Sequence, residues 1–398
     1  MAAGRWLRRV CVLQAILGAY AAYSPIRDYS GSTFFDHWTF FDQTDAGLTN
    51  GDVQFLGQSA ATSQRLAFTN GAGNTIIKVD NSSTVVWPNK RNSIRLEGNE
   101  AYGVGSLIII DIVHMPFGCS VWPAFWTRGT NGKWPDVGEI DIIEGVNRRT
   151  FNQMALHTTP GCVQAANATQ TGKSTITDCS TQQGVPGCVV QEQKPASYGT
   201  AFNAAGGGVF ATQIDVSGIF IWFFSRPDLP ENLRSATASS SLDTSSWGTP
   251  SAAWPSSSCK IEDHFTPQQI ILDLTLCGDF ATPVYNQTCP PPTKNCYEDN
   301  VLGDGSNYNE AYFEIPYIRV YNADAAATPT TVSSGSAPTF SGTSGPGSGG
   351  AAGSGNSTSD TSGGNTNNNS ALPHSLPSGS LIFTVLALVG AASSVFVL

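Results

Sequence analysis

Three carboxylates lie close together in one short stretch of this sequence, Gly138-Glu139-Ile140-Asp141-Ile142-Ile143-Glu144-Gly145. The isoleucines between them predict a β-strand. Successive side chains of a strand point to opposite faces, so Glu139 and Asp141 share one face. Strict alternation would turn Glu144 into the core, and a single β-bulge near Ile142–Ile143 returns it to the carboxylate face. We therefore expect all three carboxylates on one face, with isoleucine packed behind them.

Two glutamates on one face of a cleft are typical of glycoside hydrolysis. One attacks the sugar and the other protonates the leaving oxygen, and retention of configuration requires carboxyl groups ~5–5.5 Å apart. Asp141 is placed to hydrogen-bond the nucleophile, and its charge would keep the pKa of the acid high. Two other interpretations are a solvated acidic face, whose charges would repel one another, and a calcium site, for which one strand rarely supplies enough oxygens.

The carboxylate strand belongs to a region, residues 23–323, of short apolar runs separated by turn residues. This region has no linker, no internal repeat and no convincing amphipathic helix. Because two packed sheets can bury many short strands, the pattern predicts an all-β sandwich of about 300 residues. The runs are Gln54–Leu56, Thr75–Val79, Ser93–Leu96, Ser106–Val113, Met154–His157, Ile219–Phe224, Gln269–Leu274 and Ala311–Tyr321, the last of which alternates over much of its length.

The two ends of the chain are predicted to be separate from this domain. Residues 1–21 have a basic start, a short apolar run and a small-residue cleavage site, as in a secretory signal peptide. After a domain of residues 22–323, residues 324–369 are mostly Gly, Ser, Thr, Ala, Asn and Pro, which predicts a disordered spacer. Residues 370–398 end in an apolar tail without a basic flank. They predict a glycolipid (GPI) anchor signal with attachment at Asn369, and a tail-anchored helix is the alternative.

Charge and cysteine content favour an exported protein. Acidic residues outnumber basic ones by 30 to 20, and this net charge of −10 disfavours a nucleic-acid partner. Of nine cysteines, Cys11 leaves with the signal peptide, and none of the others has C-x-x-C spacing. We expect up to four disulfides, with the pairing left open. Glycosylation sequons fit the same compartment and lie at Asn81, Asn167, Asn286, Asn356 and Asn368.

The carboxylate motif resembles the E-x-D-x-x-E signature of glycoside hydrolase family 16, in its β-bulged, laminarinase-like branch of fungal endo-1,3(4)-β-glucanases. The resemblance covers about Phe34–Tyr321 and implies a concanavalin A-like jelly roll of two curved antiparallel sheets, with a concave substrate cleft. The other stretches that carry it are Trp122-Pro123-Ala124-Phe125-Trp126, Trp134-Pro135, Leu156-His157-Thr158, Ile221-Trp222-Phe223-Phe224-Ser225-Arg226 and Leu276-Cys277-Gly278-Asp279.

The resemblance also implies roles for single residues. Glu139 would be the nucleophile, Asp141 its assistant and Glu144 the acid/base. Aromatic rings near the cleft would stack on the C–H faces of sugars, and a histidine would face the glutamates from a neighbouring strand. Core packing is the alternative for each of these side chains. The expected substrate-binding residues are Trp122, Trp126, Trp134 and His157.

Three features limit what the resemblance implies. Phe280 stands where fungal relatives often carry Trp, and residues 201–208 are rich in Gly and Ala, so linkage preference stays open. The stretch Arg91-Asn92-Ser93-Ile94-Arg95 resembles a family strand near the cleft, but the sequence assigns no contact to Arg91 or Arg95.

Together these observations predict a secreted, surface-anchored retaining endo-β-glucanase for β-1,3 and mixed 1,3/1,4 glucans, with no cofactor and no metal. The expected partners are the glucan and the outer leaflet of the plasma membrane, and we expect a monomer at the cell surface or wall. A glucan transglycosylase is one alternative, although wall transglycosylases of the family more often carry an unbulged E-x-D-x-E. A non-catalytic glucan-binding lectin is the other, and the presence of both glutamates argues against it.

Overall fold

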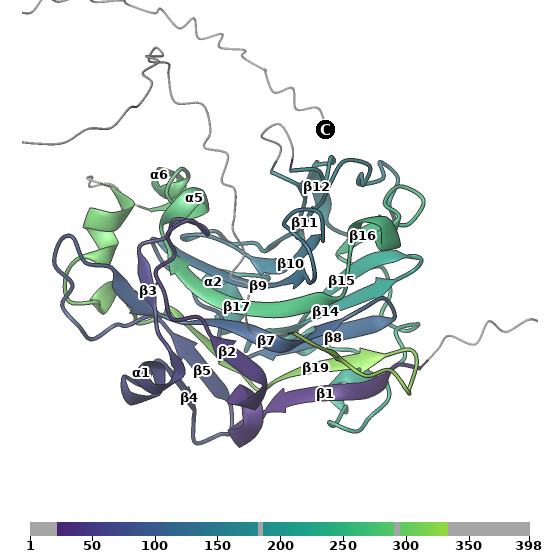
Figure 1. The fold of residues 1–398 in the computed structure, drawn as a ribbon, viewed down its shortest axis with the longest axis horizontal. Coiled ribbons are helices and arrows are strands. Elements are labelled where there is room, and N and C mark those ends of the chain that lie inside the picture. The colour runs from purple at the N-terminus through teal and green to yellow at the C-terminus, as the bar shows by residue number, and fades with distance from the viewer. Residues whose placement is uncertain (1–21, 182–185, 290–294, 333–398) are drawn as a thin grey trace, which may run out of the picture. The chain divides into compact units, whose positions relative to one another are not determined.

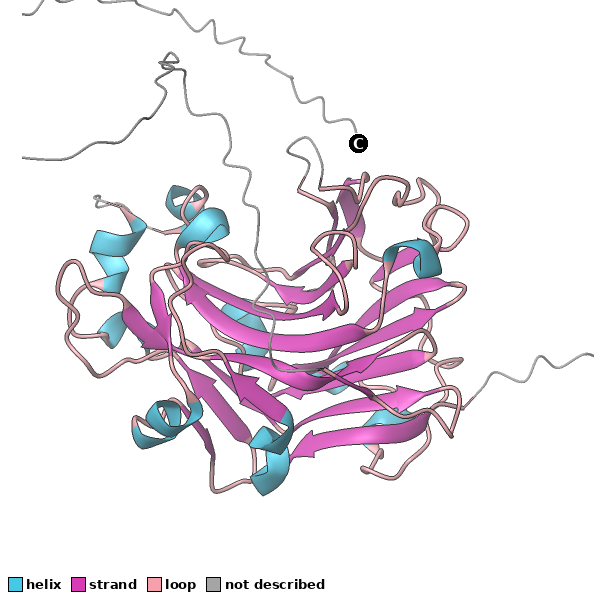
Figure 2. Cartoon of the chain, viewed as in Figure 1, coloured by secondary structure: helices cyan, strands magenta, loops and turns pink. Residues whose placement is uncertain are grey.

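The computed structural model describes residues 22–181, 186–289 and 295–332. Strands dominate these ranges, and the α-helices within them have at most six residues (Figure 2). No helix in the described part of the chain is long and apolar enough to cross a membrane. The predicted signal peptide and anchor signal, with most of the predicted spacer, lie outside the described residues.

Two antiparallel sheets form a sandwich (Figure 1). The six-stranded sheet has the order β1 (Ser24–Ser30), β19 (Tyr317–Asn322), β8 (Ser106–Ile112), β14 (Gly208–Asp215), β15 (Gly218–Ser225) and β16 (Ala252–Pro255). The nine-stranded sheet has the order β12 (Lys173–Ile176), β13 (Cys188–Gln191), β11 (Gln153–His157), β10 (Glu139–Glu144), β9 (Val121–Gly129), β17 (Gln268–Leu276), β7 (Arg95–Tyr102) and β2 (Trp38–Phe40), and β20 (Thr330–Thr331) also pairs with β7.

Smaller elements surround the sandwich. A three-stranded sheet contains β18 (Tyr312–Ile315), β5 (Thr75–Lys78) and β4 (Ala67–Thr69), and β3 (Val53–Phe55) pairs in parallel with β6 (Arg91–Ser93). The α-helices are α1 (Gln58–Ser63), α2 (Gly199–Ala204), α3 (Glu231–Arg234), α4 (Ile261–His264), α5 (Gly278–Ala281) and α6 (Tyr285–Thr288). Short 3-10 or π helices are η1 (Gly31–His37), η3 (Arg226–Asp228), η4 (Tyr297–Val301) and η5 (Ser306–Tyr308).

The main core lies between the two sheets and follows the alternation of the strands. On β17, Ile270, Leu272 and Leu274 belong to this core, whereas the buried Ile271 belongs to the opposite face. On β8 both faces are apolar because the outer one, including Ile109, packs in a second cluster with residues from β15 and the loop that follows it. Burying a side chain of this size stabilises the fold by about 1.5–3 kcal/mol.

The nine-stranded sheet is curved. Figure 1 shows β9, β10 and β17 bending so that the face turned away from β8 and β14 is concave, with α5 and α6 above one end and β11 and β12 at the other. The observed architecture is the predicted sandwich of two curved antiparallel sheets.

Two segments differ in detail from the sequence-based expectation. The run Ala311–Tyr321 forms two strands, because Pro316 lacks an N–H for a continuous ladder; β18 pairs with β5, and β19 joins the six-stranded sheet. The described chain also continues past residue 323, where β20 pairs with Glu100 and Ala101 of β7. The first residues of the predicted spacer therefore lie along the domain.

All eight cysteines of the described residues form disulfides, so the expectation of up to four disulfides is confirmed, with all four formed. The closed loops join segments that are 9 to 170 residues apart in sequence. The pairs are Cys119–Cys289, Cys162–Cys259, Cys179–Cys188 and Cys277–Cys296.

Candidate active site

The predicted bulge in β10 is confirmed. β10 pairs with β9 in regular register at Glu139 and Asp141, then shifts by one residue before Glu144. The shift places all three carboxylates on one face, while the three isoleucines of the motif are buried in the core between the sheets. Their partners on β9 are Arg128, Trp126 and Ala124.

A buried asparagine satisfies the backbone groups that the bulge removes from the ladder. The side-chain Nδ2 of Asn152 donates to the carbonyl of Ile142 at 2.9 Å, and its Oδ1 accepts from the N–H of Glu144 at 3.0 Å. The N–H of Asn152 in turn donates to Ser197 Oγ at 3.1 Å. Because buried backbone groups left unpaired are costly, Asn152 holds the bulge that orients Glu144.

The glycines on either side of the motif are required by close packing. A Cβ at Gly138, whose φ is +76°, would overlap the ring of Phe265. A Cβ at Gly145 would lie 2.5 Å from the ring of Tyr198. Both ends of β10 can therefore approach their neighbours only without a side chain.

Three indole N–H groups each donate to a different carboxylate at this face. All three predicted tryptophans are thus brought to the site, and the indole of Trp126 faces it rather than the core between the sheets. An N–H bond to a carboxylate is charge-assisted and favours the ionised form. The pairs are Trp134 Nε1 to Glu139 Oε2 at 2.8 Å, Trp122 Nε1 to Glu144 Oε1 at 3.1 Å, and Trp126 Nε1 to Asp273 Oδ1 at 2.7 Å.

His157 lies on β11 directly opposite Glu139. Its Nε2 is 2.9 Å from Asp141 Oδ2 and 3.8 Å from Glu139 Oε1. The imidazole therefore contacts both carboxylates, and its ring centroid is 6.3 Å from that of Trp134. The structure places this predicted residue beside the cluster.

Burial makes it costly for all three carboxylates to be ionised together. Burial and then repulsion from Asp141 raise the pKa of Glu139, against the opposing effects of His157 and Trp134. The same two causes raise the pKa of Glu144 to about 7. Burial, followed by repulsion from Asp273, raises the pKa of Asp141. At neutral pH the cluster therefore retains protons, as a site with a proton donor requires.

Comparison with known proteins identifies the family. A sequence model described as XgeA-like, catalytic GH16 domain, matches residues 38–321. The chain belongs to glycoside hydrolase family 16.

Individual family 16 relatives agree with this assignment. The chain is 38% identical over 335 residues, 82% of its own length and 51% of the relative's, to the endo-1,3(4)-β-glucanase xgeA of Emericella nidulans. It is 38% identical over 304 residues, covering 75% of this chain and 69% of the relative, to a probable glycosidase of Schizosaccharomyces pombe. It thus spans about half the length of the first of these proteins.

Two solved family 16 structures are similar across the same domain. Laminarinase 16A of Phanerochaete chrysosporium, bound to β-glucans, has a TM-score of 0.70 at 36% identity, covering 76% of this chain and 100% of that one. An elongating family 16 β-1,3-glucosyltransferase has a TM-score of 0.69 at 39% identity, covering 75% and 100%. The predicted family and its two-sheet fold are confirmed.

Sequence reasoning missed Asp273 of β17. It is buried, it accepts the indole bond of Trp126, and it pairs in register with Arg95 of β7. Burial raises its pKa to about 6, and the Arg95 charge opposes this rise. An aspartate inside the apolar run Gln269–Leu274 was the signal in the sequence that indicated a special position.

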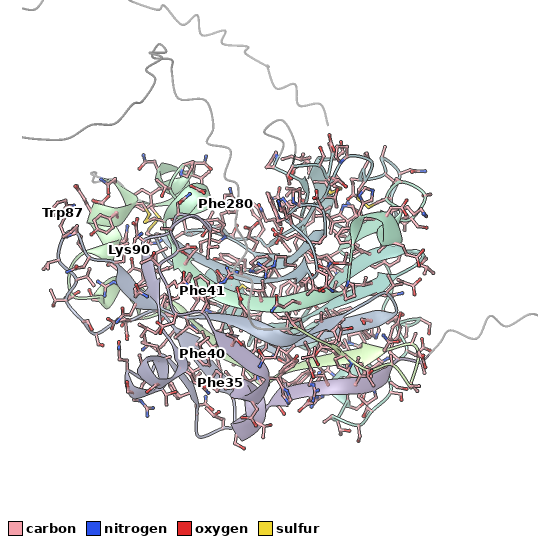
Figure 3. The ribbon with its side chains drawn as sticks, in the orientation of Figure 1. Phe35, Phe40, Phe41, Trp87, Lys90 and Phe280 are labelled. Atoms are coloured by element: carbon pink, nitrogen blue, oxygen red, sulfur yellow. A yellow bond between two sulfur atoms is a disulfide. The ribbon has the colours of Figure 1, made fainter. Side chains whose placement is uncertain are left out.

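The two arginines without an assigned contact have different surroundings. Arg95 belongs to the site: its guanidinium carbon lies 5.3 Å from the ring centroid of Trp126 and 5.4 Å from that of Phe41, which is labelled in Figure 3. Its Nε and Nη2 donate to Glu97 Oε1 at 3.0 and 2.9 Å. Arg91 is instead buried among backbone carbonyls, including that of Val301, and supports the fold.

Among the described residues, one group of three side chains has potential metal-ligand atoms within 4.8 Å of one another: Glu139, Asp141 and His157. Their nearest atoms already contact one another or an indole N–H. At this face the three side chains therefore serve as one another's partners.

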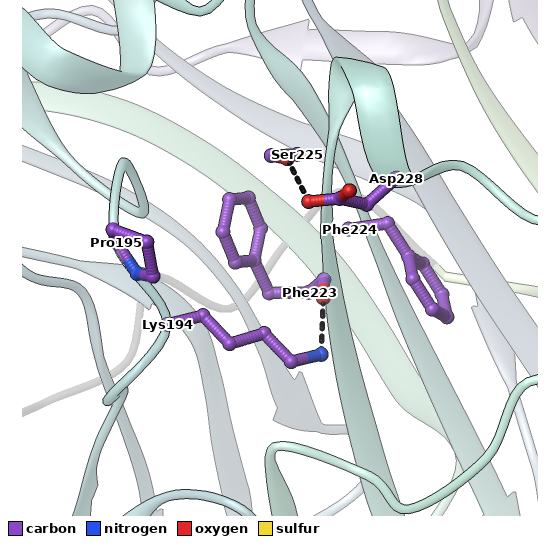
Figure 4. Close-up of a pocket in the computed structure, with 6 residues that line it drawn as sticks. All are labelled: Lys194, Pro195, Phe223, Phe224, Ser225 and Asp228. Atoms are coloured by element: carbon purple, nitrogen blue, oxygen red, sulfur yellow. Dashed lines mark hydrogen bonds between the residues drawn. The ribbon is translucent and has the colours of Figure 1, made fainter.

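A pocket outside the carboxylate cluster is lined by the end of β15 and nearby residues (Figure 4). Its polar groups bond within the protein: Lys194 Nζ donates to the carbonyl of Phe223 at 2.8 Å, and Ser225 Oγ donates to Asp228 Oδ2 at 2.6 Å. None of the predicted site residues lines it.

Proposed function

We propose that this chain is a retaining endo-β-glucanase that hydrolyses β-1,3-linked and mixed 1,3/1,4 glucans. The observation that carries the proposal is the bulged strand β10, which presents Glu139 and Glu144 on one face with a separate indole donor for each. Similarity to the endo-1,3(4)-β-glucanase xgeA and to a laminarinase bound to β-glucans supports the substrate class.

The proposed reaction has two steps. Protonated Glu144 gives its proton to the glycosidic oxygen. As the bond between this oxygen and the anomeric carbon breaks, Glu139 attacks the anomeric carbon and forms a glycosyl ester. Ionised Glu144 then takes a proton from water, whose oxygen displaces Glu139 and releases the sugar. Each step inverts the configuration at the anomeric carbon, so the two steps together retain it.

The neighbouring groups have distinct tasks in these steps. The indole N–H of Trp134 stabilises the ionised form of Glu139 before attack and again as the ester breaks. Asp141, held by His157, lies between the two glutamates and raises the pKa of Glu144 by repulsion, so that Glu144 holds a proton for the first step. Trp122, Trp126 and Trp134 would stack on sugar rings.

Product analysis tests this proposal. The described domain is incubated with soluble β-1,3-glucan, and the anomer first released is assigned by proton NMR. We expect short β-anomeric oligosaccharides, and no turnover with folded Glu139→Ala or Glu144→Ala. Glu231→Gln, on the exposed surface of α3, is the matched control and should keep full activity. Full activity in either site variant, or an α-anomeric first product, would contradict the assignment.

A glucan transglycosylase is the second candidate, because the chain is 39% identical to an elongating β-1,3-glucosyltransferase with a TM-score of 0.69. A transglycosylase shares the first step, but a sugar hydroxyl accepts the glycosyl group instead of water. Products longer than the starting oligosaccharide would favour this candidate. Binding without any change in chain length would indicate a lectin.

We further propose that the protein is exported and anchored at the cell surface. Four disulfides are typical of an oxidising compartment and support export. The signal peptide, the anchor signal and Asn369 are predicted from sequence alone. A phosphatidylinositol-specific phospholipase added to intact cells should release a protein that ends at Asn369, and retention of the protein on treated cells would contradict the glycolipid anchor.

A further inference from the structure

Glu144 and four other side chains form a closed ring of contacts that includes the Glu144 carboxyl group. Trp122 Nε1 donates to its Oε1 at 3.1 Å, and Gln153 Nε2 donates to its Oε2 at 2.7 Å. Gln153 Oε1 accepts from Arg149 Nη1 at 3.1 Å. The Arg149 guanidinium carbon lies 4.7 Å from the ring centroid of Phe280, and this ring meets Trp122 edge-on with centroids 5.5 Å apart. The last contact thus returns to Trp122, and the ring is closed.

The ring joins parts of the fold that are distant in sequence. Trp122, Glu144 and Gln153 come from the adjacent strands β9, β10 and β11, and Arg149 comes from the turn between β10 and β11. Phe280 comes from α5, which lies above one end of the concave face (Figures 1 and 3). The carboxyl group of Glu144 is therefore connected through these contacts to Phe280 of α5.

Arg149 determines which end of the Gln153 amide faces Glu144. A guanidinium has only donors, so it can bond only the oxygen of the amide. This bond leaves the NH2 group of Gln153 to face the carboxylate, where it donates the shortest hydrogen bond that Glu144 receives from a side chain. Without Arg149 the amide could rotate when Glu144 is protonated, and its oxygen could then accept the proton that Glu144 must give to the substrate.

We propose that Arg149 is a positioning residue for Glu144, acting through Gln153 and braced by Phe280. This inference rests on the proposed function, in which Glu144 is the acid/base. Glu144 donates a proton in the first step and accepts one in the second, and both transfers need the carboxyl at one place. Arg149 touches neither transferred proton.

Because Arg149 is charged and lies near Glu144, its loss should change the pH profile of the enzyme. Burial and then Asp141 raise the pKa of Glu144, whereas His157, Gln153 and Trp122 lower it. Attraction between Arg149 and Glu144 favours the charged form of both. Loss of Arg149 therefore raises the pKa of Glu144. The ionisable groups that face Glu144 are Glu139 and Asp141 on β10, His157 on β11, and Arg149 and Tyr198 from loops.

The test compares Arg149→Met with Arg148→Met in the full-length protein. Arg148 is the neighbouring, exposed arginine and takes no part in the ring, so its variant should behave as wild type. We expect Arg149→Met to lower kcat about tenfold with little change in KM, and to move the basic limb of kcat/KM to higher pH. Arg149→Lys keeps the charge, so the limb should stay near its wild-type position.

A double-variant cycle separates positioning from general stability. Because Arg149 acts through Gln153, adding Arg149→Met to Gln153→Ala should cost less than the product of the two single losses in kcat. Multiplicative losses would overturn the proposal, as would an Arg149→Met enzyme with the kcat and pH profile of Arg148→Met. If Arg149→Met does not fold, Arg149→Ala, which also removes both the charge and the donor to Gln153, takes its place in the cycle under the same criteria. Full activity in Glu144→Gln would instead refute the proposed function itself.

Discussion

Replacing Trp134 by Phe should make the candidate nucleophile harder to ionise. The substitution keeps an aromatic ring but removes the indole N–H that donates to Glu139 Oε2 at 2.8 Å. This bond stabilises the ionised carboxylate, so its loss raises the pKa of Glu139 further above its usual value. Since Glu139 must be ionised to attack, the acidic limb of kcat/KM should move to higher pH.

The size of this shift follows from the strength of the bond. A hydrogen bond to a charged group contributes about 1.5–3 kcal/mol, and one pKa unit corresponds to about 1.36 kcal/mol. The Glu139 side chain is 13% exposed, so water can replace the lost donor only in part. We therefore expect the acidic limb to move by about 1 pH unit, with a roughly tenfold loss of kcat/KM well below the limb and a smaller loss above it.

The assay is the pH dependence of kcat/KM on a soluble β-1,3-glucan, with Trp126→Phe as the matched control. That variant also loses one indole donor at the concave face, but its bond goes to Asp273 and not to Glu139. Its acidic limb should stay close to the wild-type position.

Two results would refute the reasoning. One is an acidic limb for Trp134→Phe at the wild-type pH, which would mean that the indole bond does not stabilise the ionised nucleophile. The other is an equal shift in Trp126→Phe, which would mean that losing any tryptophan at this face has the same effect.

Three further predictions concern proton donation, stability and modification. In Trp122→Phe, loss of the donor to Glu144 should move the basic limb of kcat/KM to higher pH, measured in the same assay. Replacing Cys119 and Cys289 by Ala opens a link across 170 residues and should lower the free energy of unfolding by up to about 5 kcal/mol, measured by urea denaturation. In protein secreted by a eukaryotic expression host, peptide mass spectrometry should find Asn81 without a glycan, because its side-chain amide accepts from Lys78 and donates to Asn309. The exposed sequon asparagines should be modified: Asn167 and Asn286.

Much of the site could be predicted from local sequence because it depends on the period of a strand. The alternation of Glu139, Ile140 and Asp141, with one extra isoleucine, was enough to predict the bulge that the register confirms. The even number of cysteines, in a chain expected to be exported, predicted up to four disulfides, because that prediction needs only their number. The partners of each cysteine depend on where the chain returns, and the sequence left them open.

Other parts of the site could not be predicted because they depend on which strands become neighbours. Asp273 receives the indole bond of Trp126 from 147 positions away in sequence, and it does so because β17 pairs with β9. Asn152 acquires its task only when β11 lies beside the bulge.

The sequence by itself therefore determined the carboxylates, their common face and the two-sheet fold, because side-chain alternation and apolar patterning act over a few neighbouring residues. Only the tertiary structure decided which donor bonds which carboxylate, and that Arg149 and Phe280 complete a ring that includes Glu144. The physical reason is that hydrogen bonds and burial depend on distances in space, and those distances are set by cross-strand register between segments far apart in the chain.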